Sequence, residues 1–122
     1  MLGKFPLFAA VAALAAGPAA AQADAERRAY GKCIACHSLD GVGASRYGPD
    51  LRGVMGRQAG SNPQFKHFSP AMKASKVVWT AKTLDAFLAS PATFIRGNRM
   101  VSPPIKDPAE RQAIIRYLER HR

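Results

Sequence analysis

Two cysteines and a histidine stand close together in the segment Cys33-Ile34-Ala35-Cys36-His37. Cysteines three positions apart on a helical turn can each form a thioether with one of the two vinyl groups of a porphyrin. The next residue, His37, is then carried under the iron, where its imidazole can bind as the proximal ligand. The spacing C-x-x-C-H therefore indicates covalent attachment of a c-type haem.

Other uses of a C-x-x-C pair fit this chain less well. The sequence contains only 2 cysteines, and both belong to this motif. A four-ligand zinc site would need more Cys or His, and the adjacent Cys36 and His37 could hardly both reach one tetrahedral metal. A thioredoxin-like redox pair would need βαβ strands around it, and the sequence pattern contains none. A reducible disulfide between Cys33 and Cys36 is the alternative that stays open.

The N-terminal residues 1–23 have the features of a secretory signal peptide. Lys4 supplies a short positive region, and the apolar stretch from Phe5 to Ala16 is too short to span a bilayer. Ala21-Gln22-Ala23 matches an A-x-A cleavage site, so we expect cleavage after Ala23 and a mature domain of residues 24–122. A retained anchor is the alternative. Export, most simply to a bacterial periplasm, agrees with haem attachment, which takes place outside the cytoplasm.

The chain is strongly basic, with 18 Lys and Arg against 8 Asp and Glu and a net charge of +10. Lys4 is the only charged side chain in residues 1–23, so cleavage would leave a net charge of +9. Such a charge could attract nucleic acid, an anionic membrane or an acidic protein. Export argues against nucleic acid, and no run of five or more Lys or Arg suggests a basic tail. We therefore expect an acidic docking surface on a partner protein and no stable membrane anchor.

Helix signals recur along the mature chain, separated by loops rich in Gly and Pro. An N-cap residue, a Pro at the first helical position or an apolar face marks each helix. The expected helices are residues 24–36, 70–74, 81–89, 91–95 and 108–120. The residues that mark their starts are, in the same order, Asp24, Ser69, Thr80, Ser90 and Asp107. Asp107-Pro108-Ala109-Glu110 also predicts a capping box. Val77-Val78-Trp79 is too short for a sheet. These patterns predict a small all-α domain whose Gly-rich loop, residues 38–60, packs on a buried haem.

In this order, these motifs resemble class I cytochrome c, the family of soluble mitochondrial-type and bacterial photosynthetic-type carriers. The resemblance covers residues 25–121 and implies a single-domain all-α fold around one covalent haem c. Its landmarks are Cys33-Ile34-Ala35-Cys36-His37-Ser38-Leu39-Asp40, Gly48-Pro49-Asp50-Leu51-Arg52-Gly53-Val54, Gly56-Arg57-Gln58-Ala59-Gly60, Val78-Trp79-Thr80, Leu84-Asp85-Ala86-Phe87-Leu88 and Gly97-Asn98-Arg99-Met100.

The resemblance also implies roles for particular residues. Cys33 and Cys36 would hold the haem, and His37 and Met100 would be the two iron ligands. The carbonyl of Pro49 would accept a hydrogen bond from the second ring nitrogen of His37. The remaining expected haem contacts, all near a propionate, are Arg57, Trp79 and the amide of Asn98.

Some alternatives to these roles remain open from the sequence. Trp79 could be simple core and Arg57 a solvated charge. Four other side chains could compete with Met100 for the iron, or be filler or surface residues: Met55, Met72, His67 and His121. The chain also departs from the usual family pattern around the ligand loop, at Arg96 for Pro, Asn98 for Thr, Phe87 for Tyr and Ser102 for an aromatic. These departures bear on the stability of the Met100 bond to the iron.

Ligation by His and Met fills both axial sites and leaves no open position for a substrate, so the resemblance implies an electron carrier and not an enzyme. A shuttle from a quinol-oxidising complex to a terminal oxidase or photosynthetic reaction centre is the first hypothesis. A dedicated acceptor for a periplasmic dehydrogenase is the second, and a haem peroxidase or gas-binding protein with a labile distal ligand is the third. We expect a monomer that docks through cations around the exposed haem edge, namely Lys32, Arg46, Arg96, Arg99 and Lys106. The haem-attachment machinery is a further expected partner.

Overall fold

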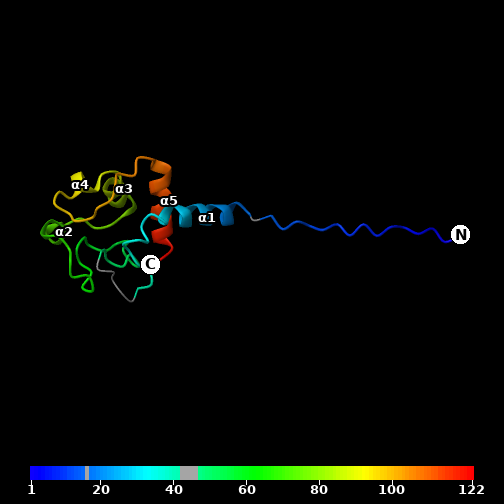
Figure 1. Cartoon of the computed structure of the whole chain (residues 1–122), viewed down its shortest axis with the longest axis horizontal. Coiled ribbons are helices and arrows are strands. Elements are labelled where there is room, and N and C mark those ends of the chain that lie inside the picture. The colour runs from blue at the N-terminus through cyan, green and yellow to red at the C-terminus, as the bar shows by residue number, and fades with distance from the viewer. Residues whose placement is uncertain (16, 42–46) are drawn as a thin grey trace.

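The computed structural model describes residues 1–15, 17–41 and 47–122. Within these ranges the chain forms helices joined by long loops (Figure 1). The helices are α1 (Pro18–Tyr30), α2 (Pro70–Ala74), α3 (Ala81–Ala89), α4 (Pro91–Phe94) and α5 (Pro108–Glu119). The described residues contain no strand, and one isolated antiparallel bridge joins Gln58 to Val78. The prediction of an all-α domain is confirmed.

The first and last helices pack against each other and form one side of the core. α1 contacts α5, and α3 contacts both α5 and α4 (Figure 1). Tyr30 of α1 stacks on Tyr117 of α5, with ring centroids 4.7 Å apart. Ile114, Ile115 and Leu118 of α5 are almost fully buried. This helix pair therefore fixes the end of α1, from which the haem motif continues.

α1 differs from the predicted helix at both ends. It begins at Pro18 with Gly17 as its N-cap, and Asp24 lies inside it, 3.2 Å from Arg27. The alanines of residues 19–23 have the highest helix propensity, so the helix extends back through them. The regular helix stops at Tyr30, and residues 31–36 form consecutive turns. The predicted boundaries of residues 24–36 are therefore wrong by several residues.

Residues 1–15 extend away from the rest of the protein without regular structure (Figure 1). Their apolar side chains, including Phe5, Phe8 and Leu14, are exposed. No helix among the described residues combines the length and the apolar composition needed to cross a membrane.

The short helices α2 and α3 begin where their capping residues predict. Ser69 accepts a hydrogen bond from the Met72 backbone N–H at 3.0 Å and starts α2. Thr80 caps α3 and exchanges hydrogen bonds with Thr83 in a reciprocal capping box. These local bonds satisfy N–H groups that have no partner inside the helix.

α5 also begins as predicted, but its predicted capping box is wrong. Asp107 accepts a hydrogen bond from the Ala109 N–H at 3.0 Å. Glu110, the expected second member of the box, forms an ion pair with Lys32 instead. Lys32 immediately precedes Cys33, so this ion pair links α5 to the haem motif.

Candidate haem site

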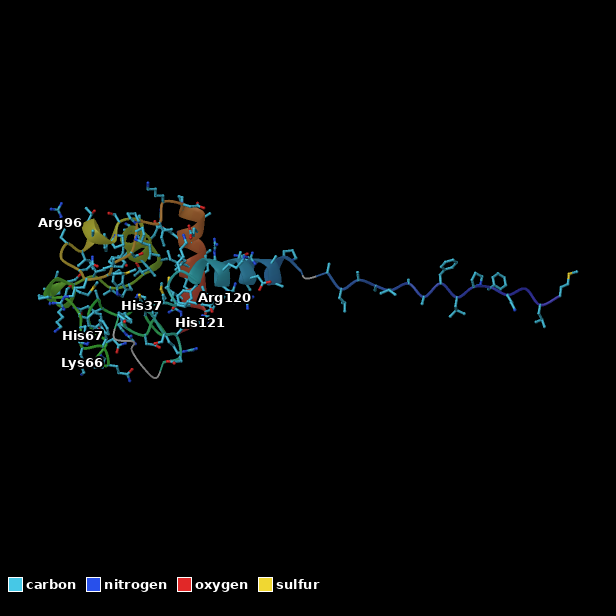
Figure 2. The ribbon with its side chains drawn as sticks, in the orientation of Figure 1. His37, Lys66, His67, Arg96, Arg120 and His121 are labelled. Atoms are coloured by element: carbon cyan, nitrogen blue, oxygen red, sulfur yellow. The ribbon has the colours of Figure 1, made fainter. Side chains whose placement is uncertain are left out.

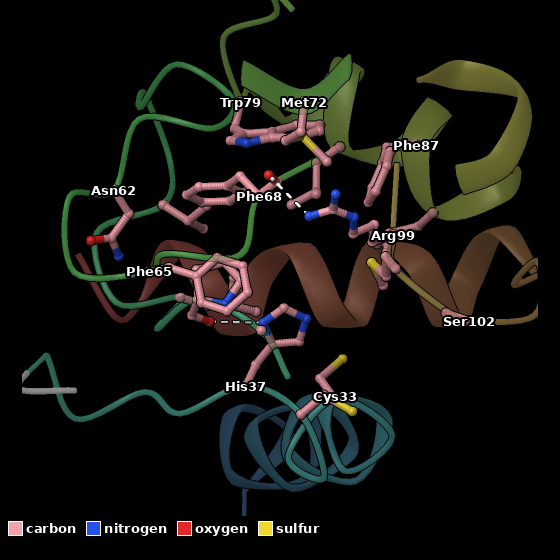
Figure 3. A pocket seen from close by; sticks show the side chains of 18 of the residues that line it. Cys33, His37, Asn62, Phe65, Phe68, Met72, Trp79, Phe87, Arg99 and Ser102 are labelled. Atoms are coloured by element: carbon pink, nitrogen blue, oxygen red, sulfur yellow. Dashed lines mark hydrogen bonds between the residues drawn. The ribbon is translucent and has the colours of Figure 1, made fainter. Parts of the chain in front are cut away.

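A cavity of about 830 Å³ lies between the turn after α1, the loops 47–69, α2, α3, the segment 99–105 and α5 (Figure 3). Its wall is mostly apolar, with side chains such as Val54, Phe65, Leu84 and Leu88. The volume is in the range of about 300–1,000 Å³ that is usual for ligand and cofactor pockets. A large planar apolar group can therefore be buried here.

The turns after α1 bring Cys33, Cys36 and His37 to one wall of this cavity. The Cys33 N–H donates to the Tyr30 carbonyl at 2.8 Å, and the His37 N–H donates to the Cys33 carbonyl at 2.9 Å. The two cysteines are not joined in a disulfide. Burial raises the pKa of the Cys33 thiol to about 11, so this thiol is protonated at neutral pH. Both cysteines and the histidine thus face the same space.

The imidazole of His37 is held in one orientation. Its Nδ1–H donates to the Pro49 carbonyl at 2.8 Å, which leaves Nε2 with a free lone pair (Figure 3). Burial lowers the pKa of His37, although the Pro49 carbonyl and the Asp50 carboxylate act in the opposite direction. The ring is therefore neutral and suited to bind a metal through Nε2.

At position 48, beside this imidazole, only a glycine fits. A Cβ at this position would lie 2.6 Å from His37 Cε1 and 2.8 Å from the Cys36 carbonyl oxygen. Real contacts of a Cβ are not this short, so any side chain would displace the ring or the backbone. Gly48 and Pro49 together fix the position of the ring, one by its small size and the other by its carbonyl.

Asp50 supports this loop, a role that the sequence analysis did not assign to it. Its carboxylate is 3% exposed and accepts hydrogen bonds from Ser38 Oγ (2.7 Å), the Gly41 N–H (3.0 Å) and the Arg52 N–H (2.8 Å). Burial alone would raise the pKa of Asp50, but these hydrogen bonds outweigh it and the pKa is lowered. The bond to the N–H two residues later is an Asx turn, which an Asp after Gly-Pro could have suggested.

On the other side of the cavity, the segment after α4 carries Met100. Figure 3 shows Arg99, the residue before Met100, across the cavity from His37. Met100 lines the cavity and is half-buried. Among the competing side chains, Met72 and His67 also line the cavity.

The structure places the other two competitors elsewhere. Met55 packs against the hydrophobic core, and His121 donates from Nδ1 to the Tyr117 carbonyl at 2.7 Å. Neither is among the described residues that line the cavity. The geometry therefore leaves Met100, Met72 and His67 within reach of the same space.

Arg57 and Trp79 lie side by side on the cavity wall. The Trp79 N–H donates to the Arg57 carbonyl at 2.9 Å, next to the Gln58–Val78 bridge. Trp79 is 7% exposed. Neither the Arg57 guanidinium nor the Trp79 indole N–H has a hydrogen-bond acceptor within the described residues, yet both side chains line the cavity. These donors are suited to a buried carboxylate such as a haem propionate.

Asn98 is placed differently from the sequence expectation. It does not belong to the described cavity lining, and its side chain bonds to its own turn. An amide offers two N–H donors and one acceptor, and the backbone around residues 91–100 uses all three. A propionate contact is therefore not the role that this geometry gives to Asn98.

The expected docking cations have different surroundings. Lys32 is paired with Glu110, and Arg99 donates to the carbonyls of His67 (3.2 Å) and Phe68 (3.4 Å). Both line the cavity. Arg96 and Lys106 are exposed, and Arg96 lies on the side of the protein away from Arg120 (Figure 2). Arg46 lies outside the described residues.

Comparison with known proteins agrees with this geometry. The family model "Cytochrome c" matches residues 16–122. The chain belongs to the cytochrome c family. The predicted family is confirmed, and the cofactor of this cytochrome is one covalently bound haem c. This cytochrome is a haem-based electron carrier.

The relatives include a bacterial cytochrome c2 and a plant cytochrome c. The cytochrome is 44% identical over 91 residues to cytochrome c2 iso-2 of Magnetospirillum fulvum, covering 75% of this chain and 93% of that protein. It is 40% identical over 88 residues to cytochrome c of Sesamum indicum, covering 72% and 78% of the two chains. Among solved structures, cytochrome cH from Methylobacterium extorquens matches with a TM-score of 0.74 and 37% identity, over 80% of this cytochrome and 97% of that chain.

Proposed function

We propose that this cytochrome is a periplasmic single-electron carrier in which Cys33 and Cys36 hold the haem and His37 and Met100 bind its iron. The observation that carries this proposal is that one cavity is lined by both cysteines, by His37 with its free Nε2 and by Met100. Haem c, when bound, supplies reversible one-electron chemistry. His37 and Met100 would then be the two iron ligands that the protein supplies, which would leave no position for a substrate.

The remaining residues of the site keep the two oxidation states similar in structure. The Pro49 carbonyl and the backbone at Gly48 prevent rotation of the His37 ring. Arg57 and Trp79 offer N–H donors to the propionates, which offsets the cost of burying their charge. The apolar wall would exclude water from the haem and, together with the neutral thioether of Met100, would favour the reduced state. Little then needs to rearrange when an electron arrives or leaves.

The proposed location depends on residues 1–23 acting as a cleaved signal peptide. The side chains of residues 1–15 and 17–23 are exposed and lie outside the core, which supports removal of this segment; α1 begins at Pro18, so cleavage after Ala23 would shorten this helix at its start. The mature chain would carry a net charge of +9 and would be attracted to acidic docking surfaces of redox proteins. We place it between a quinol-oxidising complex and a terminal oxidase or reaction centre, with a periplasmic dehydrogenase as the alternative donor.

The axial ligands can be tested on protein made together with haem-attachment machinery. Oxidised His/Met haem has a weak near-infrared charge-transfer band from sulfur to iron, and a redox titration of the visible spectrum would give the potential. We expect Met100→Ala to abolish the band and to let cyanide bind. Met72→Ala is the matched control, because its thioether lines the same cavity. Loss of the band in Met72→Ala and its retention in Met100→Ala would contradict the assignment.

A further inference from the structure

Asn98 lies two residues before Met100, in the turn that follows α4. Its Nδ2 donates to the Pro91 carbonyl at 2.7 Å and to the Ile95 carbonyl at 2.8 Å. Its Oδ1 accepts from the Met100 N–H at 2.9 Å. One half-buried side chain therefore ties the backbone of Met100 to both ends of α4.

Only an amide side chain can make this set of bonds. A Ser or Thr hydroxyl at this position could accept from the Met100 N–H, but it has a single O–H and could not donate to two carbonyls. An Asp carboxylate has no donor at neutral pH and would face two carbonyl oxygens. The preceding Gly97 has a φ of +88°, and a Cβ there would approach the Ala71 Cβ at 3.2 Å. The turn therefore depends on Gly97 for its direction and on Asn98 for its bonds.

The chain after Met100 has few other attachments. Val101 is fully exposed, and Ser102 bonds only to the carbonyl of the adjacent Pro103, at 3.3 Å. Within the described chain, residues 101–104 form no hydrogen bond to another element. The next fixed point is Ile105, whose N–H donates to the Leu88 carbonyl at 3.0 Å. Asn98 is thus the nearest anchor that acts directly on the backbone of Met100.

We propose that Asn98 is the positioning residue that holds Met100 against the iron and limits how often the thioether leaves it. The inference rests on the proposed function, in which Met100 is the sixth ligand. Loss of the Asn98 side chain would free the Met100 N–H and release the turn from α4. The population with the thioether detached would then rise, while the overall fold would be retained by the α1–α5 and α3–α5 contacts.

The test uses imidazole as a probe of the detached state. Imidazole is titrated into the oxidised, haem-loaded protein while the near-infrared band is followed. It binds only when the thioether is off, so its apparent affinity rises in proportion to the detached population. For Asn98→Ala we expect an affinity at least about fivefold higher, the factor that corresponds to one typical lost hydrogen bond. Asn98→Ser keeps an acceptor for the Met100 N–H and should recover part of the effect.

Thr93→Ala is the matched control. Thr93 is an exposed residue of α4 that bonds to Ser90 and does not touch Met100. An imidazole affinity in Asn98→Ala that is no higher than in Thr93→Ala would overturn the inference. If Asn98→Ala does not mature, the same comparison is decided with Asn98→Ser. A wild-type protein without the near-infrared band would overturn both proposals, whereas an intact band with unchanged imidazole affinity would overturn only this one.

Discussion

The carboxylate of Asp50 holds together the two loops that support the proximal histidine. It accepts hydrogen bonds from Ser38 and Gly41 on one loop and from Arg52 on the other, while the neighbouring Pro49 carbonyl accepts a hydrogen bond from His37 Nδ1–H. Because these bonds favour the charged form, the pKa of Asp50 is lower in the folded protein than its ordinary value of about 3.9. Asp50 therefore contributes to stability at neutral pH.

Asp50→Asn should destabilise the haem-loaded protein in a pH-dependent way. The contribution of a carboxylate with a lowered pKa is present above its unfolded pKa and is lost as the pH falls through the folded pKa. At pH 7 we expect the free energy of unfolding to fall by about 1–3 kcal/mol, and the difference to shrink below about pH 4. Denaturant titrations at pH 7 and pH 3 measure this. Asp107→Asn, at the exposed N-cap of α5 where Asn caps about as well as Asp, is the control with little expected effect.

The sequence indicates some of these residues and not others, for a physical reason. The C-x-x-C-H motif is local, because the bonds of the chain alone keep Cys33, Cys36 and His37 together. The partners of Asn98 depend on how the turn after α4 folds, so the sequence predicted a propionate contact whereas the folded turn gives backbone partners. Asp50 is similar, since its donors lie up to 12 residues away. The role of a polar side chain with several possible partners can be assigned only when the fold shows which partner lies within hydrogen-bond distance.

At the scale of helices, the contact between α1 and α5 includes a buried charge. Glu26 of α1 is 1% exposed, and its Oε2 lies 2.7 Å from Nε of Arg120, just after α5. The Arg120 side chain is 55% exposed, so solvent screens its side of the pair. The pair therefore matters mainly because Glu26 would otherwise be a buried charge without a partner.

Removing Arg120 should weaken the protein more than removing the charge of Glu26. In Arg120→Ala the buried carboxylate loses its cation, and we expect the free energy of unfolding to fall by about 1–3 kcal/mol. In Glu26→Gln the side chain keeps its size, and the exposed Arg120 is solvated, so the loss should be smaller. Thermal or denaturant unfolding of the two variants measures the difference. An equal or larger fall in the free energy of unfolding for Glu26→Gln would show that the buried carboxylate does not depend on Arg120.

The helices themselves were predictable because their signals are local. Ser69, Thr80 and Asp107 cap the helices that follow them, as their sequence positions predict. The predictions that are wrong concern positions where a distant residue or the helix propensity of the neighbouring residues determines the structure. Glu110 pairs with Lys32 rather than with its own helix start, and α1 extends back through an alanine run.

At the scale of the whole molecule, leaving the large cavity without a bound group would cost much free energy for a small domain. Without a bound group its mostly apolar wall would be exposed to water, and each Å² of apolar surface left in water costs about 25 cal/mol. A domain of this kind has only about 5–15 kcal/mol of net stability. The chain therefore needs the haem as part of its core.

Variants that cannot attach haem should lack a stable fold and not only activity. We expect the double variant Cys33→Ser, Cys36→Ser, purified without haem, to lose near-ultraviolet circular dichroism and amide protection from hydrogen exchange. Haem-loaded wild-type protein is the reference. Slow exchange in α1 and α5 of the haem-free variant would contradict this prediction.

Docking is also a property of the whole molecule, because a net charge of +10, or +9 after the proposed cleavage, creates a long-range field. Neutralising Lys32 or Arg99, which line the cavity, should slow association with an acidic redox partner, and the effect should decrease as salt rises. Stopped-flow electron transfer to an oxidase over a range of ionic strengths measures this. Lys32→Gln and Arg99→Gln are compared with Arg122→Gln, an exposed cation at the C-terminus. Arg120 is unsuitable as a control because it pairs with Glu26.

Equal slowing by all three variants would mean that total charge directs association and that the cavity rim does not. In that case the ion pair of Lys32 with Glu110 and the carbonyl contacts of Arg99 would be structural, because both already have partners in the protein.

The packing of the first helix on the last also fixes an order of assembly. A chain exported from its N-terminus delivers Cys33 and Cys36 to the far side of the membrane well before Arg120. Until α5 arrives, Glu26 lacks its ion-pair partner Arg120 and Tyr30 lacks its stacking partner Tyr117, and the cavity lacks the wall that Ile114 and Leu118 form. If the chain is exported as proposed, the attachment machinery would meet the two thiols before α5 has packed against α1. We therefore expect attachment to be easiest before residues 108–122 have emerged and α5 has formed.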